Sequence, residues 1–202
     1  MHIAEGVLTA PLLGGGAALT AAGLAVGLKK MDYDKLPRVA LMAAVFFVAS
    51  LIHVPIGPAS VHLVLNGLVG LLLGWAAFPA IFVGLALQAV LFQYGGLTAL
   101  GVNTFSMASP ALLCYWIFAP LTRGESRALA LAAGFGAGSL AVLISSLLVA
   151  LALWLTGEAF VGMSKALVLA NLPVMLIEGV ITALIVDFLR KARPAMLGAG
   201  GI

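Results

Sequence analysis

The sequence predicts an all-α polytopic membrane protein with about seven transmembrane helices, its N-terminus outside and its C-terminus in the cytoplasm. Of its 202 residues, 63% are hydrophobic and only 8% are charged, whereas charged residues make up about 25% of a typical soluble domain. The mean hydropathy is +1.21. Seven spans of roughly 20 residues would occupy about 140 positions. We therefore expect residues 1–202 to form a single membrane domain, with no separate soluble catalytic domain.

Seven apolar runs mark the expected helices in order. They cover about residues 7–28, 39–56, 61–77, 79–94, 105–122, 128–155 and 165–189. Each run is long enough to be a candidate span. The segment before the first run, MHIAEG, contains no Lys or Arg. It lacks the positive region of a cleaved signal peptide, so we expect the N-terminus to be retained.

The segments between the runs carry the turn signals. Pro55, Gly57 and Pro58 predict a turn at residues 54–60. Irregular backbone at membrane depth must be covered by protein or line a wet cavity. We therefore expect residues 94–105, YGGLTALGVNTF, to form a loop folded into the outer mouth of the bundle. Three Gly-x-x-x-Gly pairs predict closely packed helices; these are Gly23 with Gly27, Gly70 with Gly74, and Gly134 with Gly138.

The positive charges indicate the orientation. Nine of the ten Lys and Arg residues form three clusters, namely Lys29, Lys30, Lys35 and Arg38; Arg123 and Arg127; and Arg190, Lys191 and Arg193. An odd number of helices with the N-terminus outside puts all three clusters on the cytoplasmic side and leaves only Lys165 outside, as the positive-inside rule favours. The basic residues therefore indicate topology rather than a nucleic-acid partner. We expect a multi-pass protein of the bacterial cytoplasmic (inner) membrane.

All three histidines of the chain fall at the predicted outer face. They are His2, His53 and His62, in the N-terminal segment, at the end of the second run and at the start of the third. A lone interfacial histidine is commonly a hydrogen-bonded or solvated side chain. Because neutral imidazole is the commonest transition-metal ligand, three of them at one mouth favour a metal site.

His2 offers more than its ring. The α-amino nitrogen of Met1, the deprotonated amide nitrogen of His2 and its Nδ1 can close a five-membered and a six-membered chelate ring around one ion. Such nitrogen donors suit Ni(II), Cu(II) or Co(II), whereas Mg(II) and Ca(II) prefer oxygen. The amine must lose a proton at a free pKa of about 7.7–8.0. Metal binding is therefore expected to weaken at acid pH.

A fourth nitrogen is expected from an internal histidine. We favour His62, because Asn66 lies one helical turn further on and is placed to hold its ring by a hydrogen bond. His53 is the alternative ligand or a neighbour of the site. Glu5, in the first turn beside the site, is expected to accept a hydrogen bond from a ligand or to cap the helix.

Two carboxylates belong to the last run. Asp187 lies near the basic tail and is expected at the interface, whereas Glu178 lies deeper, after Pro173. An intramembrane carboxylate is a functional candidate by default. For Glu178, pairing with polar groups inside the bundle and a role in transport are both open.

Several functions are excluded by missing motifs. The chain has no GxxxxGK[ST] phosphate loop, no HExxH pair and no arginine-rich helix, and its single cysteine, Cys114, allows neither an intrachain disulfide nor a Cys-rich zinc site. We expect no enzyme activity and no organic cofactor. Metal captured outside would then enter through ATP-hydrolysing partners or through an ion gradient coupled to Glu178. A structural membrane subunit without a metal site is the third possibility.

Three segments resemble a known family over essentially the whole chain. MHIAEG, IHVPIGPASVHLVLNGLVGLLLG and YGGLTALGVNTFSMASPALL closely resemble the substrate-capture S component of energy-coupling factor (ECF) transporters for cobalt and nickel, the CbiM/NikM family. The resemblance implies that Co(II) or Ni(II) is the transported substrate, for cobalamin synthesis or nickel enzymes. It also implies a metal held by the Met1 amine, by the backbone and ring of His2, and by His62, with the loop of Asn103 packed over it.

The resemblance further implies partners. These are a transmembrane coupling (T) subunit, cytoplasmic ATPase subunits that hydrolyse the ATP, and a small auxiliary membrane subunit. ATP hydrolysis in the partners would reorient the S component so that it releases the ion inward.

Overall fold

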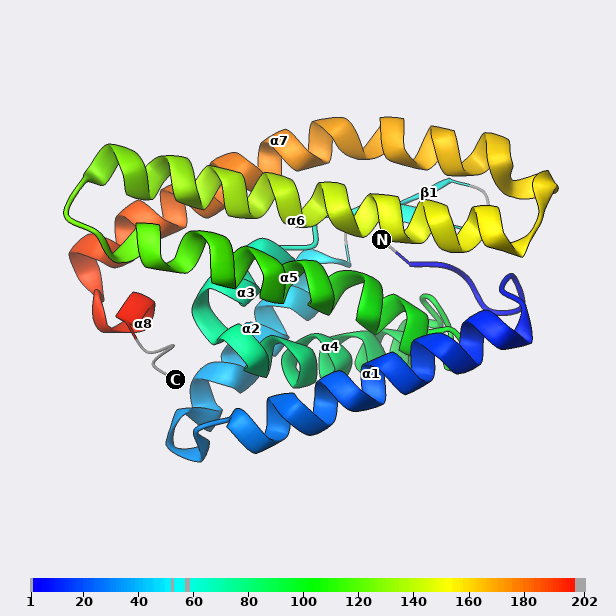
Figure 1. Ribbon diagram of the computed structural model, residues 1–202, viewed down its shortest axis with the longest axis horizontal. Coiled ribbons are helices and arrows are strands. Elements are labelled where there is room, and N and C mark those ends of the chain that lie inside the picture. Colours follow the sequence, from blue (N-terminus) through cyan, green and yellow to red (C-terminus); the bar gives the residue numbers. More distant parts are fainter. Residues whose placement is uncertain (1, 52, 57–58, 199–202) are drawn as a thin grey trace.

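The computed structural model confirms an all-helical architecture with one small addition. It describes residues 2–51, 53–56 and 59–198. The helices are α1 (Ala10–Lys30), α2 (Leu36–Ala49), α3 (Asn66–Leu73), α4 (Ala77–Phe92), α5 (Leu100–Arg123), α6 (Arg127–Thr156), α7 (Val161–Ala192) and α8 (Ala195–Gly198), with short 3-10 turns at Tyr33–Lys35, Gly74–Ala76 and Glu158–Phe160. The addition is a hairpin of β1 (His53–Ile56) and β2 (Ala59–His62). Figure 1 shows the long helices running side by side.

Five helical segments of the described chain are long and apolar enough to cross a membrane: residues 10–30, 66–92, 100–123, 127–156 and 158–192. The second expected span, 39–56, differs most, because α2 has 14 residues. At 1.5 Å per residue it is about 21 Å long, short of a hydrocarbon core of about 30 Å. The third and fourth expected spans share the segment 66–92, in which α3 and α4 are joined by a 3-10 turn.

The hairpin replaces helix where two apolar runs meet. β1 pairs with β2 antiparallel, and the register places His53 opposite His62 and Val54 opposite Val61. Of the turn predicted at 54–60, residues 54–56 and 59–60 therefore lie in the two strands, and residues 57 and 58 lie outside the described residues. Pro55 explains the change, since a proline disfavours helix at the residue before it. β-Branched Val54 and Val61 favour the extended backbone.

Glycines set the helix packing around α3, which is buried from Asn66 to Leu72. A Cβ atom added at Gly70 would collide with the backbone of Ala111 in α5, and one added at Gly67 with the backbone of Ala137 in α6. At Gly138 it would lie 2.5 Å from the carbonyl oxygen of Glu178 in α7. The predicted close approach of helices at the glycine pairs is confirmed at Gly70 and Gly138. It holds the segment after β2 firmly inside the bundle.

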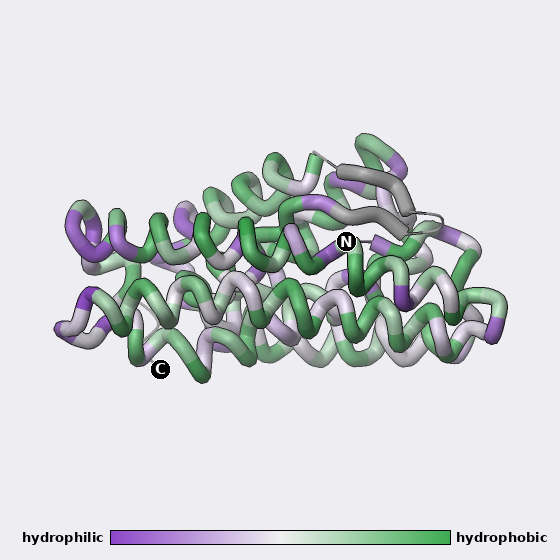
Figure 2. The backbone as a smooth tube through the Cα atoms, turned by 90° about the horizontal axis from the view of Figure 1, so that it is seen from above, coloured by the Kyte–Doolittle hydropathy of each residue, from purple (hydrophilic) through white to green (hydrophobic). Residues whose placement is uncertain are grey.

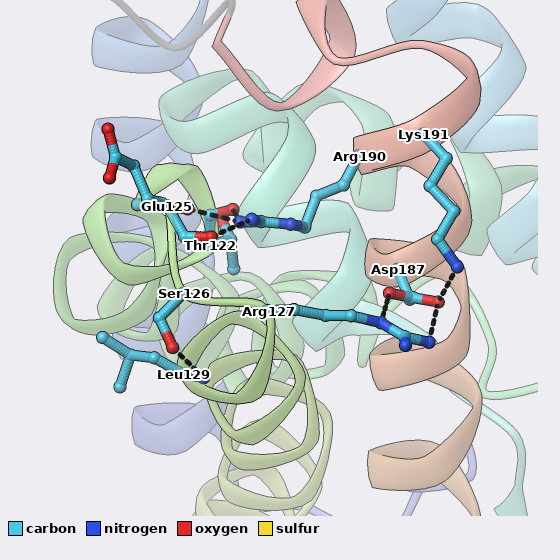
Figure 3. Close-up of polar contacts among 9 residues, drawn as sticks. Thr122, Glu125, Ser126, Arg127, Leu129, Asp187, Arg190 and Lys191 are labelled. Carbon is cyan, nitrogen blue, oxygen red and sulfur yellow. Dashed lines mark hydrogen bonds and ion pairs between the residues drawn. The ribbon is translucent and has the colours of Figure 1, made fainter.

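The three basic clusters lie at one end of the molecule. Figure 1 shows the α1–α2, α5–α6 and α7–α8 connections together at the left, and Figure 2 shows hydrophilic residues gathered toward the helix ends. Arg190 donates to the carbonyls of Thr122, Gly124 and Glu125 at 2.7–3.1 Å. Asp187 pairs with Arg127 and with Lys191 at 2.7 and 2.8 Å (Figure 3). We refer to this end as the basic end; its position on the cytoplasmic side stays a prediction.

Candidate metal site

The N-terminal segment folds back into the bundle and brings two histidines together. Figure 1 shows it turning from the start of α1 toward the centre of the molecule. The rings of His2 and His62 stack with their centroids 4.4 Å apart and their planes 29° from parallel. Both residues are 3% exposed. The two histidines favoured as ligands, which we call the histidine pair, therefore lie in contact and are shielded from solvent.

The ring of His62 is held in one tautomer. Its Nδ1 lies 2.6 Å from the carbonyl oxygen of Leu63 and donates to it, so Nε2 carries the lone pair. Nε2 is buried and has no hydrogen-bond partner among the described residues. Burial lowers the pKa of His62 to about 4, against the smaller opposing effect of the hydrogen bond to Leu63. The ring is neutral near pH 7, which is the form that binds metals.

Asn103 fixes the backbone beside His2. Its Oδ1 accepts from the amide nitrogen of Ile3 at 2.9 Å, and its Nδ2 donates to the carbonyl oxygen of Ile3 at 3.1 Å. Ile3 is fully buried in the core. Asn103 is thus close to the site as predicted, but it acts on the backbone of the N-terminal segment. It sits on α5, which begins at Leu100, so the expected loop 94–105 is shorter than predicted.

The loop before α5 packs against the same segment through two glycines. Gly95 and Gly96 have φ values of +77° and +86°, which favour glycine. A Cβ added at Gly95 would lie 2.9 Å from Nδ2 of Asn103 and 3.3 Å from Cβ of His2. Oε1 of Glu5 accepts from the amide nitrogen of Thr98 at 3.1 Å. Glu5 therefore ties the N-terminal segment to this loop. The roles of the two glycines were not predicted, although the Gly-Gly pair is a visible turn signal.

Alanine at Gly95 is expected to destabilise the protein by about 1–2 kcal/mol, the cost of a left-handed backbone for an L-residue, with the close contact to Asn103 adding to it. The measurement is the Tm of the purified protein in detergent. Gly15→Ala in α1 is the matched control, because its added Cβ meets no atom within 4 Å and alanine suits a helix better than glycine. Equal Tm values for the two variants would contradict the close packing at Gly95.

Glu178 holds the turn that follows His62. Its carboxylate accepts from the amide nitrogens of Val64 and Leu65, with both oxygens 2.9 Å from Leu65 N. It is fully buried, and the described residues place no Lys or Arg in an ion pair with it. Leu65 has a left-handed backbone, with φ +53°. The carboxylate thus satisfies two backbone donors at a tight strand-to-helix turn. This corresponds to the first of the two roles left open for Glu178, pairing with polar groups inside the bundle.

The prediction for Asn66 was wrong in its geometry. His62 ends a strand and Asn66 begins α3, so the two do not share a helix face. Nδ2 of Asn66 donates to the carbonyl oxygen of Met107 at 3.0 Å and to Oγ of Ser145 at 2.9 Å. Its Oδ1 is buried with no hydrogen-bond partner in the described part of the chain. Asn66 therefore joins α3 to α5 and α6 below the site.

Two predicted ligands are described incompletely or not at all. Met1 lies outside the described residues, and of His53 the structure describes the backbone, opposite His62 in the hairpin register. Within residues 2–51, 53–56 and 59–198, no three His, Cys, Asp or Glu side chains cluster as a metal site. The Met1–His2 chelate and the His53 side chain, which lie outside that search, stay predictions.

The chain is similar to proteins named for metal transport. Residues 2–196 match the family described as CbiM, cobalt uptake substrate-specific transmembrane region. A protein of Haemophilus influenzae named for metal transport is 41% identical over 202 residues, covering 98% of this chain and 97% of the relative. The cobalt transport protein CbiM of Sorangium cellulosum is 36% identical over 213 residues, covering 98% and 94%. A crystal structure of a transition metal transporter matches with a TM-score of 0.74 at 27% identity, over 95% of this chain and 93% of that chain.

Proposed function

The chain belongs to the CbiM family of cobalt uptake substrate-specific transmembrane regions, and from that membership we propose that it captures Co(II) or Ni(II) at the outer face of the membrane for ATP-driven uptake. It is a membrane component of cobalt or nickel transport. Relatives named for both metals span most of the chain: the cobalt protein of Sorangium cellulosum matches 98% of it, as does a fused nickel protein, NikMN, of Archaeoglobus fulgidus.

The observation that carries the proposal is the buried contact between His2 and His62. A stacked pair of buried imidazoles, in which Nε2 of His62 has no hydrogen-bond partner among the described residues, has the chemistry of a borderline transition-metal site. In our proposal the metal is bound by the Met1 amine, by the amide nitrogen and Nδ1 of His2, and by Nε2 of His62. Asn103 and Glu5 hold the N-terminal segment that carries the first three donors.

Energy for uptake is proposed to come from partners. The chain has no phosphate-binding loop for ATP. We therefore propose an ECF-type assembly with a transmembrane coupling (T) subunit, cytoplasmic ATPase subunits and a small auxiliary membrane subunit. The fused NikMN relatives support additional membrane partners, since there this type of domain is one part of a longer protein: the chain covers 68% of the Archaeoglobus fulgidus protein and 38% of the Rhodobacter capsulatus one.

The test is uptake of radioactive cobalt and of nickel at tracer concentration, in cells that express the chain with its partners. His2→Ala is expected to lower uptake of the transported metal by more than about tenfold, because losing even an outer-shell partner of a metal ligand costs 10–100-fold in affinity. The metal whose uptake falls is the substrate.

His53→Ala tests the alternative internal ligand and is expected to leave uptake unchanged, with membrane levels compared by immunoblot. Unchanged uptake in His2→Ala would remove the metal site from the N-terminus. A loss in His53→Ala alone would make His53 the internal ligand. Full uptake by the purified protein in liposomes without ATPases would favour the gradient-driven alternative.

A further inference from the structure

A second candidate ligand site lies at the basic end, apart from the histidine pair. It is a cavity of about 730 Å³ between the α1–α2 turn, the end of α3 and the last turns of α5. Its charged and aromatic lining includes Lys30, Lys35, Arg38, Arg123, Trp75 and Trp116. His62 precedes α3, whereas the cavity is lined by Leu72 and Leu73 at the far end of that helix. We call this space the basic cavity.

The basic cavity has an excess of positive charge. Its lining contains four Lys and Arg residues and one acidic residue, Asp32, which pairs with Lys35 at 2.8 Å. Arg38 and Arg123 instead donate to carbonyl oxygens, at 2.7 Å to Leu72 and 2.8 Å to Leu197. Neither arginine forms an ion pair with a carboxylate of the described residues. Two arginines thus line one cavity without a carboxylate partner among the described residues.

Arg38 also retains an unused donor. Its Nε is buried and has no hydrogen-bond partner among the described residues. Burying a polar group without a partner is costly, and guanidinium groups bind phosphate through paired N–H donors. An anion in the basic cavity would offset the positive charge of the two arginines that line it.

The aromatic residues indicate where the ligand's apolar part would lie. The Trp75 and Trp116 rings meet edge to face with centroids 5.8 Å apart, and the Lys30 ammonium lies 5.3 Å from the Trp75 centroid. Trp116 is 54% exposed. Tryptophan is enriched at the membrane–water interface, and basic pockets between transmembrane helices bind anionic lipid headgroups. The lining of the basic cavity therefore combines tryptophan rings with basic side chains.

We propose that the basic cavity binds a phosphate group, and that the headgroup of an anionic phospholipid is its ligand. The phosphate lies between Arg38, Arg123 and Lys30, and the acyl chains leave past Trp116 toward the bilayer. A free phosphate would make the same contacts with the basic side chains, but it has no acyl chains to lie against Trp116. This site does not depend on the metal site, so its failure would leave the proposed function intact.

The test uses the full chain in detergent, with Trp154→Phe so that only Trp75 and Trp116 report. Tryptophan fluorescence is titrated with dihexanoyl phosphatidylglycerol, dihexanoyl phosphatidylcholine or inorganic phosphate. We expect a saturable change with phosphatidylglycerol, none with phosphatidylcholine, and at least tenfold weaker binding of inorganic phosphate. Lys30→Gln is expected to weaken phosphatidylglycerol binding about fivefold, as one lost basic charge near an anionic lipid implies. Lys29→Gln, the matched control at the adjacent position outside the lining, is expected to change it less than twofold.

Each other outcome counts against part of the proposal. Equal affinity for inorganic phosphate and phosphatidylglycerol would keep the phosphate site and reject the lipid as its ligand. Equal weakening by Lys29→Gln and Lys30→Gln would reject the basic cavity as the site, because general surface charge would then explain the binding. A response to a tetraglutamate peptide with none to either phosphate compound would reject phosphate and assign the cavity to an acidic protein segment.

Discussion

Inserting a leucine between Met1 and His2 is expected to lower metal uptake by more than about 100-fold, beyond the 10–100-fold that outer-shell changes cost. Asn103 holds Ile3 by two hydrogen bonds, so the residue next to Ile3 keeps its place beside His62. The insertion leaves the histidine there but moves the terminal amine one residue further away. The five-membered ring between the terminal amine and the amide nitrogen of the histidine can then no longer form.

An alanine insertion at the same place is the matched control. A small second residue permits removal of the initiator methionine, which leaves an amine directly before histidine as in the wild type. Uptake is therefore expected to stay within about threefold of the wild-type value. This is smaller than the loss of about 10–100-fold that follows removal of a residue hydrogen-bonded to a metal ligand. Mass spectrometry of the purified proteins establishes both N-termini. Equal uptake by correctly processed leucine and alanine variants would exclude the terminal amine as a ligand.

Uptake is the appropriate measurement for comparing the leucine and alanine insertions. An amine followed at the third position by histidine can still chelate a metal in solution, so binding to the purified leucine variant does not report the site. Transport needs the metal to engage His62 inside the bundle. The pair of insertions thus tests the spacing between the amine and the histidine, with little change in composition.

The sequence predicted those parts of the fold in which an apolar run forms a helix. The expected runs 128–155 and 165–189 lie within α6 and α7, and the three basic clusters do lie at one end. The hairpin was missed because an apolar run does not distinguish a buried strand from a buried helix. Residues 53–62 carry that ambiguity, and only pairing of the two strands resolves it.

The sequence indicated which residues of the candidate site lie close together, but not which hydrogen bonds hold them in place. His2, His62 and Asn103 were singled out from residue chemistry and family resemblance, and the structure brings them close together. The bond from Ile3 to Asn103 spans 100 positions, and that from Leu65 to Glu178 spans 113. Contacts at such separations come from the packed bundle, so no local spacing in the sequence indicates them.

Glu178→Leu is expected to destabilise the protein and to reduce metal uptake together. Leucine leaves the amide nitrogens of Val64 and Leu65 buried without acceptors, at about 1–3 kcal/mol for each. The turn after His62 then loses the carboxylate that holds it. The measurements are the Tm of the purified protein and cobalt or nickel uptake at matched membrane levels. Glu158→Leu, at an exposed position just before α7, is the control for replacing a carboxylate with leucine.

Glu178→Gln separates a positioning role from a proton-carrying one. The glutamine retains one carbonyl oxygen, which can accept from Val64 and Leu65, but it cannot take up and release a proton. As a positioning residue, Glu178 predicts that the glutamine variant recovers part of the Tm lost in Glu178→Leu and recovers uptake with it. A proton carrier predicts a wild-type Tm with no uptake. Because the carboxylate is bound to two backbone donors of the turn beside His62, we expect Tm and uptake to change together.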